Sequence, residues 1–369
     1  MKAIQWIISA LVAVVIIAAA VGGGVYFTRL KSIHSIHKLT DYENYNLYRM
    51  DIDYAYDLDR LIDRGITDNQ SMINAILAEA LPYLPIHMKA PNFGCSAFCT
   101  QGTDGHTLMG RNYDFKNDTS AMLVYCTPKD GYASVAFAAL DNINANTPDA
   151  SMAKKLATLT APFICLDGMN EKGVSIAVLT LDSDPTYQQT GKPMIATTLA
   201  IRLVLDRAAT TAEAVELLSK YDMFASSGRD YHFYITDASG DGRVLEYDCN
   251  DLARPLTVTP SRSVTNFFVM YKDNVLPNQR NGVYGHGRER YDAIEEILDA
   301  NAGSIDREIA WQALQAASQA PNPKDVTSNT QWSILYDNTA LTAEAVIRRD
   351  WNTKTSYDLV SNVAVTDVG

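Results

Sequence analysis

The fold of this chain is decided by residues 92–100, NFGCSAFCT, and residues 104–114, DGHTLMGRNYD. The Asp104-Gly105 pair is a strong turn signal between two runs of strand-forming residues, so the stretch predicts a β-hairpin. The returning strand then brings Arg111 and Asp114 toward the end of the first strand that carries Cys95. The stretch therefore predicts a thiol, a guanidinium and a carboxylate close together at one end of a sheet.

These three side chains have a chemical use together. A cysteine thiol has an ordinary pKa of about 8.5 and needs a neighbouring cation to ionise near neutrality, which Arg111 can supply. Asp114 can hold an amino group through a charge-assisted hydrogen bond. The alternative interpretation is a purely structural ion pair between Arg111 and Asp114.

The composition is that of a folded enzyme-sized chain. Its 369 residues are 47% hydrophobic and 20% charged, so a well-buried core is expected. A formal net charge of -12 argues against nucleic-acid binding, which favours a basic surface. The five cysteines are an odd number without CxxC spacing, so a zinc site and a disulfide framework are both disfavoured. No metal and no cofactor are expected, and the cysteines are interpreted as buried thiols with one reactive member.

Residues 1–28 are predicted to be a membrane anchor. Ala3 to Thr28 contains no charged side chain, and about 20 apolar residues suffice for a helix that crosses a bilayer. A single-pass protein of the cell membrane with an exported catalytic domain is therefore favoured. The alternative is a cleaved signal peptide, with residues 18–20, AAA, as the cleavage site, and a secreted protein.

Residues 29–94 are predicted to be a stalk and helical prosegment, and residues 95–369 the catalytic domain. Residues 29 to about 50 are polar and contain several tyrosines, whereas residues 51–81 show two helical patterns, the second capped at Asn69 or Ser71. After Cys95, strand patterns are interrupted by two pairs of helices, which indicates a layered α+β domain. The expected strands are 95–100, 107–112, 122–127, 133–139, 174–181, 232–236, 243–247, 264–270, 331–336, 343–348 and 356–359, and the expected helices are 194–208, 211–221, 288–300 and 306–317.

The string from Cys95 through Asp104-Gly105 to residues 110–114, GRNYD, resembles the amino-terminal motif of choloylglycine hydrolases and penicillin V acylases. These are cysteine members of the amino-terminal-nucleophile hydrolases, and the spacing from Cys95 to Arg111 and Asp114 is similar to theirs without a gap. The resemblance continues in order at residues 167–174, DGMNEKGV, residues 232–237, HFYITD, residues 264–266, VTN, and residues 288–291, RERY.

The resemblance implies a four-layer αββα sandwich and a role for each matching residue. Cys95 would be the nucleophile, its own freed α-amine the base, and Arg111 the group that stabilises the thiolate. Asp114 would orient the amine, Asn266 would donate to the oxyanion, and Arg290 would support that pocket. The alternatives are Cys99 for the nucleophile, a turn role for Asn266, and Arg288 in place of Arg290.

One position departs from the family pattern. The bile-salt enzymes have an asparagine in a Gly-Leu-Asn string where this chain has residues 178–180, VLT. A backbone N–H of Thr180 would then serve the oxyanion, and the change weakens an assignment to bile salts.

The resemblance also implies that the chain is a precursor, because the nitrogen of Cys95 is an amide until the bond after Gly94 is cut. The expected cut is self-cleavage, in which the Cys95 thiol attacks the carbonyl carbon of Gly94. The expected function is hydrolysis of linear, non-peptide C–N amide bonds in N-acylated small molecules through an acyl-thioester on Cys95. An acyltransferase with the same nucleophile and a non-catalytic, membrane-tethered binding protein are the alternatives. The prosegment is expected to stay bound after cleavage, and a homo-oligomer is left open.

Overall fold

The computed structural model describes residues 23–82, 94–115, 118–280, 282–322, 324 and 328–368. Within these ranges the chain builds two large β-sheets and a small parallel pair. The seven-stranded sheet has the order β14 (Ser263–Val264), β3 (Gly94–Gln101), β4 (Thr107–Asp114), β15 (Thr330–Asp337), β16 (Thr342–Ile347), β17 (Thr353–Asp358) and β18 (Val363–Val368). The nine-stranded sheet has the order β1 (His37–Lys38), β2 (Leu47–Ile52), β5 (Ala121–Cys126), β6 (Ser134–Ala139), β7 (Cys165–Asn170), β8 (Ser175–Leu181), β11 (Asp230–Thr236), β12 (Arg243–Tyr247) and β13 (Leu256–Pro260). The parallel pair is β9 (Met194–Ala196) with β10 (Asp222–Phe224).

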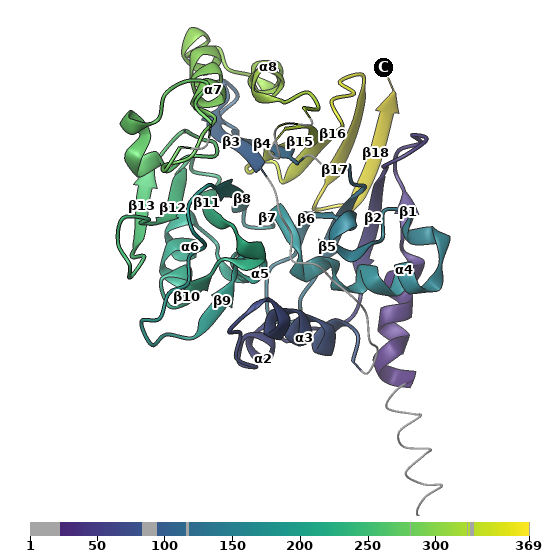
Figure 1. Ribbon diagram of the computed structural model, residues 1–369. Helices are drawn as coiled ribbons and strands as arrows, with labels where there is room; N and C mark the ends of the chain where they lie inside the picture. Colours follow the sequence, from purple (N-terminus) through teal and green to yellow (C-terminus); the bar gives the residue numbers. More distant parts are fainter. Residues whose placement is uncertain are drawn as a thin grey trace, which may run out of the picture.

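Helices cover the outer face of each large sheet (Figure 1). The helices α7 (Arg288–Ala300) and α8 (Arg307–Ala317) contact β3, β4 and β15, whereas α5 (Thr197–Arg207) and α6 (Thr211–Leu218) contact β7, β8 and β11. The two sheets contact each other through β3 and β8. The layers therefore follow the order helix, sheet, sheet, helix that the family resemblance implies.

The alternation of side chains along β3 shows why this strand is buried on both faces. Cys95, Ala97 and Cys99 point into the core between the two sheets, while Phe98 points the other way into a cluster with Trp311 on α8. Successive side chains of a strand face opposite sides, so an apolar strand between two layers contributes to both cores. The predicted hairpin is confirmed, and its register pairs Cys95 with Tyr113 and Gly94 with Asp114.

The segment before the catalytic domain differs from the expected stalk. Strand β2 pairs in parallel with β5 inside the nine-stranded sheet, and Leu47 and Met50 are fully buried. The polar side chain of Arg49 finds partners in Asp51 and in the carbonyl oxygen of Asn362, near the carboxyl end of the chain. Because Asn362 and strand β5 are distant in sequence, the polar pattern of this segment resembled an exposed stalk.

The two helices predicted in the same segment are present. They are α2 (Leu58–Ile62) and α3 (Asn69–Ala80), and the cap of α3 is Asp68, one residue before the expected position. Asp68 accepts a hydrogen bond from the backbone of Ser71 in a capping box. A further short α-helix, α4, spans Met152–Ala157.

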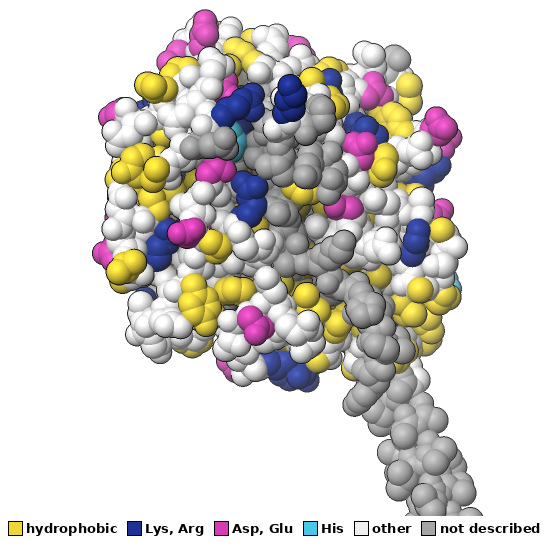
Figure 2. Space-filling view, viewed as in Figure 1, with side chains coloured by type: hydrophobic (Ala, Val, Ile, Leu, Met, Phe, Trp, Pro, Cys, Tyr) yellow, Lys and Arg dark blue, Asp and Glu magenta, His cyan; other side chains and the backbone are white. Residues whose placement is uncertain are grey.

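The predicted anchor at residues 1–28 lies mostly outside the described residues, which begin at Gly23. Residues 23–34 are helical, and Arg29 in the middle of this helix donates to the carbonyl oxygens of Glu79 and Ala80 on α3. No helix within the described ranges has both the length and the apolar character needed to cross a membrane. On the face that Figure 2 shows, acidic and basic side chains are interspersed.

The strand expected at residues 264–270 is wrong beyond Val264. The chain leaves the sheet there and forms a 3₁₀ helix at Val269–Asn274. The carboxylate of Glu246 accepts hydrogen bonds from the backbone nitrogens of Val269 and Met270, so these groups are satisfied outside a sheet. This departure frees Asn266 to turn toward β3.

Candidate active site

The predicted site residues meet at one end of the two sheets. Cys95 is at the start of β3, and Asp114 is at the end of the adjacent β4. Thr180 lies near the end of β8, Asn266 follows β14, and Arg290 is in the first turn of α7. Cys95, Arg111, Asp114, Thr180 and Asn266 are each fully buried, and Arg290 is nearly so.

Asn266 and Arg290 form hydrogen bonds with the backbone of Cys95. The nitrogen of Cys95 donates to Oδ1 of Asn266 at 3.0 Å, and the carbonyl oxygen of Cys95 accepts from Nη1 of Arg290 at 2.9 Å. Nη2 of Arg290 also donates to Oδ1 of Asn266, at 2.7 Å. Gly287 makes this arrangement feasible, because a Cβ there would lie 2.4 Å from Nη2 of Arg290. The two side chains therefore hold Cys95 in one backbone position.

Arg290 rather than Arg288 occupies the site. Arg288 instead bonds Asp292 on its own helix and the carbonyl oxygen of Lys272. Of the two predicted candidates, only Arg290 contacts Cys95 and Asn266.

Arg111 lies beside the Cys95 thiol and is held by three groups. Its Nη1 donates to the carbonyl oxygen of Asn112 at 2.6 Å, and its Nη2 to that of Val178 at 2.9 Å. Its Nε lies 3.4 Å from Oδ2 of Asp167, which is an ion pair between two fully buried side chains. In this position the positive charge of the guanidinium interacts with the sulfur of Cys95.

Asp114 is a buried carboxylate with several donors. Oδ1 accepts from the hydroxyl of Thr330 at 2.6 Å, and Oδ2 accepts from Nε2 of Gln319 at 2.9 Å and lies 3.4 Å from Nη1 of Arg290. Burial raises the pKa of Asp114 above its usual range, and the Arg290 guanidinium opposes this rise. Asp114 pairs with Gly94 in the sheet, so it lies next to the residue that precedes the backbone nitrogen of Cys95.

The thiol of Cys95 is protonated in the uncut chain. Burial raises its pKa to about 12, although the nearby Arg111 guanidinium works in the opposite direction and Asp114 adds to the rise. An uncharged thiol with an amide nitrogen is a weak nucleophile without a base of its own. In this chain Cys95 therefore has an uncharged thiol and an amide nitrogen that is not a base.

Thr180 takes part through an atom that was not expected. Its carbonyl oxygen accepts a hydrogen bond of 2.8 Å from Nδ2 of Asn266, and its hydroxyl has no hydrogen-bond partner among the described residues. A carbonyl oxygen cannot stabilise an oxyanion, so the predicted contact through the Thr180 N–H stays a prediction. Nδ2 of Asn266 retains a second hydrogen, which is available for a developing negative charge.

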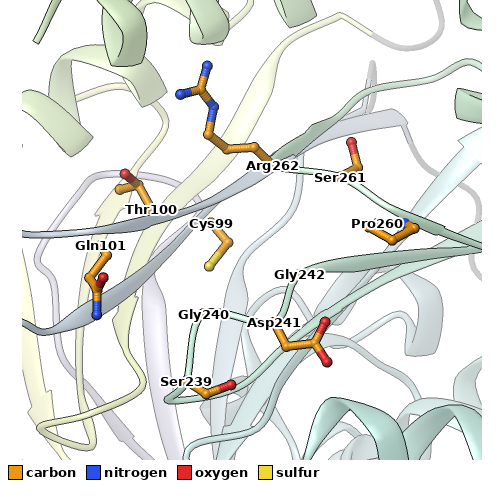
Figure 3. A pocket seen from close by; sticks show the side chains of 10 residues that line it. All are labelled: Cys99, Thr100, Gln101, Ser239, Gly240, Asp241, Gly242, Pro260, Ser261 and Arg262. Atoms are coloured by element: carbon orange, nitrogen blue, oxygen red, sulfur yellow. The ribbon is translucent and has the colours of Figure 1, made fainter. Parts of the chain in front are cut away.

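Cys99 is not part of this cluster. Its sulfur accepts from the hydroxyl of Thr236 at 3.0 Å, and burial raises the pKa of its thiol to about 11. Figure 3 shows Cys99 on the wall of a separate cavity of about 570 Å³, across from Asp241 and below Arg262. All five cysteines are free thiols, and Cys95 is the one beside Arg111.

Two features of the site were missed from the sequence. Asp167 belongs to the quoted string DGMNEKGV but was given no role, although it pairs with Arg111. Gln319 and Thr330, which donate to Asp114, lie more than 200 residues after it in the chain and carry no local motif. The described residues contain no cluster of three His, Cys, Asp or Glu side chains that would hold a metal ion.

The two large sheets and the helices that cover them form an αββα sandwich. A family model described as linear amide C–N hydrolases, choloylglycine hydrolase family, matches residues 95–254. The predicted family resemblance is confirmed by this match, and the chain is an amide hydrolase.

Solved structures share the fold at low sequence identity. A variant of conjugated bile acid hydrolase from Clostridium perfringens aligns with a TM-score of 0.55 and 16% identity over 74% of this chain and 97% of that one. Penicillin V acylase from Agrobacterium tumefaciens aligns with a TM-score of 0.53 and 18% identity over 72% of this chain and 86% of that one. At this identity the likeness establishes the fold alone.

Proposed function

We propose that this protein hydrolyses linear, non-peptide amide bonds of N-acylated small molecules, with Cys95 as the nucleophile after cleavage of the Gly94–Cys95 bond. The observation that carries the proposal is the environment of Cys95: its nitrogen, its carbonyl oxygen and its thiol each face a different side chain, namely Asn266, Arg290 and Arg111. A structural cysteine needs none of these backbone contacts. The family match also begins at Cys95.

Cleavage would activate the site in one step. It replaces an amide nitrogen, which has no basic lone pair, with an α-amine whose ordinary pKa is about 7.7–8.0. The amine takes the thiol proton, and the resulting thiolate beside Arg111 attacks the substrate carbonyl carbon. The oxyanion so formed accepts from Nδ2 of Asn266, while Asp114 and Arg290 hold the surrounding groups in place.

The remaining steps balance on the same atoms. The tetrahedral intermediate collapses with loss of the substrate amine, which takes the proton from the α-ammonium group of Cys95. The acyl group is then a thioester on Cys95, and water attacks its carbonyl carbon while the α-amine removes a proton from that water. Release of the carboxylic acid restores the thiol.

The prosegment is proposed to remain bound after the cut and to tether the enzyme to the cell membrane through residues 1–28. Strand β2 supports retention, because it pairs with β5 along six consecutive residues and buries Leu47 and Met50 in the same sheet as β8. A strand inside a sheet leaves unpaired backbone groups behind when it is removed. Exported localisation follows from the apolar amino-terminal segment.

The amino-terminal residue of the purified, active protein tests the proposal. Mass spectrometry is expected to find a chain that begins at Cys95, and a panel of N-acyl amides is expected to yield free acid and amine. Cys95→Ala is the control, and it should remain uncut and inactive while keeping its circular dichroism. An uncut wild-type chain with full hydrolytic activity would refute the processing, and an active Cys95→Ala enzyme would refute the nucleophile.

A further inference from the structure

A buried carboxylate forms an ion pair with the Arg111 guanidinium. Asp167 on β7 is fully buried. It accepts hydrogen bonds from Nε1 of Trp332 at 3.1 Å and from the hydroxyl of Tyr336 at 2.6 Å, and both donors are on β15 of the opposite sheet. With Nε of Arg111 at 3.4 Å, three groups from two strands of the other sheet converge on one carboxylate.

Asp167 and the ionised thiol of Cys95 both interact with the positive charge of Arg111. The other two nitrogens of Arg111 donate to the backbone carbonyl oxygens of Asn112 and Val178, which carry no net charge. The anionic partners of the buried guanidinium are therefore Asp167, Cys95 when ionised, and more distantly Asp114. Charges in a buried site are weakly screened, so each anion affects the others.

We propose that Asp167 is a positioning residue that acts through Arg111: it fixes the orientation of the guanidinium and sets how much of its positive charge is left for the sulfur of Cys95. The proposal rests on the proposed role of Cys95 as nucleophile. Asp167 does not touch the thiol, and its influence passes through the Arg111 side chain. Trp332 and Tyr336 donate to Asp167, so β15 fixes the position of this carboxylate.

Other ionisable groups lie around the pair. Tyr113 on β4 is next to Cys95 in the sheet, and burial raises its pKa well above the ordinary value, so it is uncharged near neutrality. Asp114 on β4 and Tyr231 on β11 act on the Cys95 side, and Arg290 on α7 offsets Asp114. Tyr336 and Cys165 lie on the Asp167 side, and burial raises the pKa of each well above its ordinary value, so both are uncharged near neutrality. Burial likewise raises the pKa of Asp167, and Arg111 is the main group that opposes this rise.

The proposal predicts the direction in which the ionisation of Cys95 shifts in two variants. Asp167→Asn removes the negative charge that competes for Arg111, while keeping the size of the side chain and one of its two acceptor oxygens. The thiolate of Cys95 then becomes the nearest anionic partner of Arg111, so Cys95 should ionise at a lower pH. Tyr336→Phe removes a donor that spreads the charge of Asp167, so Asp167 should draw more on Arg111 and Cys95 should ionise at a higher pH.

The test is a titration of the thiolate by its ultraviolet absorbance, taken as the difference between each protein and its Cys95→Ala counterpart. This readout needs neither a substrate nor access of a reagent to the buried thiol. Mass spectrometry of the amino-terminal residue sorts the samples that keep Cys95, so that midpoints are compared only between cut samples or only between uncut samples. The Cys95→Ala counterparts stay uncut and supply the background absorbance of the other chromophores. We expect the midpoint of Asp167→Asn to fall by about one pH unit, a tenfold change in the ratio of thiolate to thiol.

The matched control is Asp206→Asn. Asp206 forms another buried Arg–Asp pair, with Arg202 at 2.6 Å on α5, and Arg202 is fully buried. This change should lower stability in a comparable way without moving the Cys95 midpoint. A midpoint for Asp167→Asn that is unchanged, raised, or moved no more than in Asp206→Asn would overturn the proposal.

Two outcomes keep this inference separate from the proposed function. If no amide is hydrolysed but the midpoints move in opposite directions in Asp167→Asn and Tyr336→Phe, the positioning role stands and the proposed reaction fails. If Asp167→Asn does not fold, Tyr336→Phe alone decides, since an unmoved or lowered midpoint in that variant contradicts the coupling. Where turnover is measurable, Asp167→Asn is expected to lower kcat and to change the pH profile of kcat, while KM changes little.

Discussion

The backbone nitrogen of Cys95 donates a hydrogen bond of 3.0 Å to the side-chain oxygen of Asn266, which lies 171 residues later in the chain. The same oxygen accepts from Arg290, and the Asn266 amide nitrogen donates to the carbonyl oxygen of Thr180. One side chain thus connects β3, β8 and α7 at the point where the proposed nucleophile begins. The amine that cleavage would release is already in place beside its partner.

Asn266→Ala should reduce turnover strongly because it removes the side-chain donor to the oxyanion. Loss of one such donor lowers kcat by roughly 10²–10³-fold in enzymes of this kind of chemistry. Asn266→Asp separates two functions, since a carboxylate still accepts from Cys95 and Arg290 but donates nothing. Steady-state kinetics should show a similar fall in kcat for both variants; an Asn266→Asp enzyme with normal kcat would contradict the donor role.

The Cys95 thiol should be inert in the uncut chain and reactive after cleavage. Burial raises its pKa to about 12 in the uncut form, so the thiolate fraction at pH 8 is very small. Iodoacetamide treatment of uncut and cut protein, followed by peptide mass mapping, measures this difference. Cys165 is a suitable internal control because it is buried away from the cut, and its labelling should not change.

Asp114→Asn should abolish activity without lowering stability at neutral pH. Burial raises the folded-state pKa of Asp114 above its unfolded value, so its contribution to stability is fully present below the unfolded pKa and is lost as the pH rises through the folded pKa. Near pH 7 the ionised carboxylate is therefore a cost that Asn removes. Urea unfolding from pH 4 to pH 7 should show a smaller loss of stability with rising pH in the variant than in wild type.

A steeper loss in the variant, or a clearly less stable variant at pH 7, would show that the hydrogen bonds from Thr330 and Gln319 outweigh the burial of the charge. Thr330→Val is the matched control, because it removes one donor to Asp114 and leaves the carboxylate charged. It should be destabilised at pH 7, where that charge needs its donors.

Met50→Ala should weaken the attachment of the amino-terminal segment. Met50 is fully buried on β2, and truncation of such a side chain costs about 2–5 kcal/mol through lost burial and a residual cavity. In the cut protein, the prosegment and the catalytic chain should co-elute in gel filtration and separate at a lower urea concentration in this variant. Lys38→Ala on the exposed β1 serves as the control, and equal behaviour of the two variants would argue against β2 as the attachment.

The sequence predicted most of the regular structure of the catalytic domain because its signals are local. The hairpin around Asp104-Gly105 follows from a turn signal between two apolar runs, and α7 and β12 were predicted with the bounds that the structure has. Where partners are distant, local patterns failed. Residues 29 to about 50 resembled a stalk, although β2, which begins at Leu47, is buried against β5. The chain after Val264 turns away from the sheet toward Glu246.

For the site, the sequence by itself determined the trio of Cys95, Arg111 and Asp114, since a tight hairpin with a set register brings those positions to one end of two strands. Family resemblance added Asn266 and Arg290. Only the tertiary structure decided that Asn266 receives a hydrogen bond from the Cys95 nitrogen, and that Asp167 pairs with Arg111. The Asp167–Arg111 pair joins strands of different sheets, and Asn266 reaches Cys95 from the segment that follows β14. The geometry of both contacts depends on how sheets and connecting segments pack, which no spacing along the chain encodes.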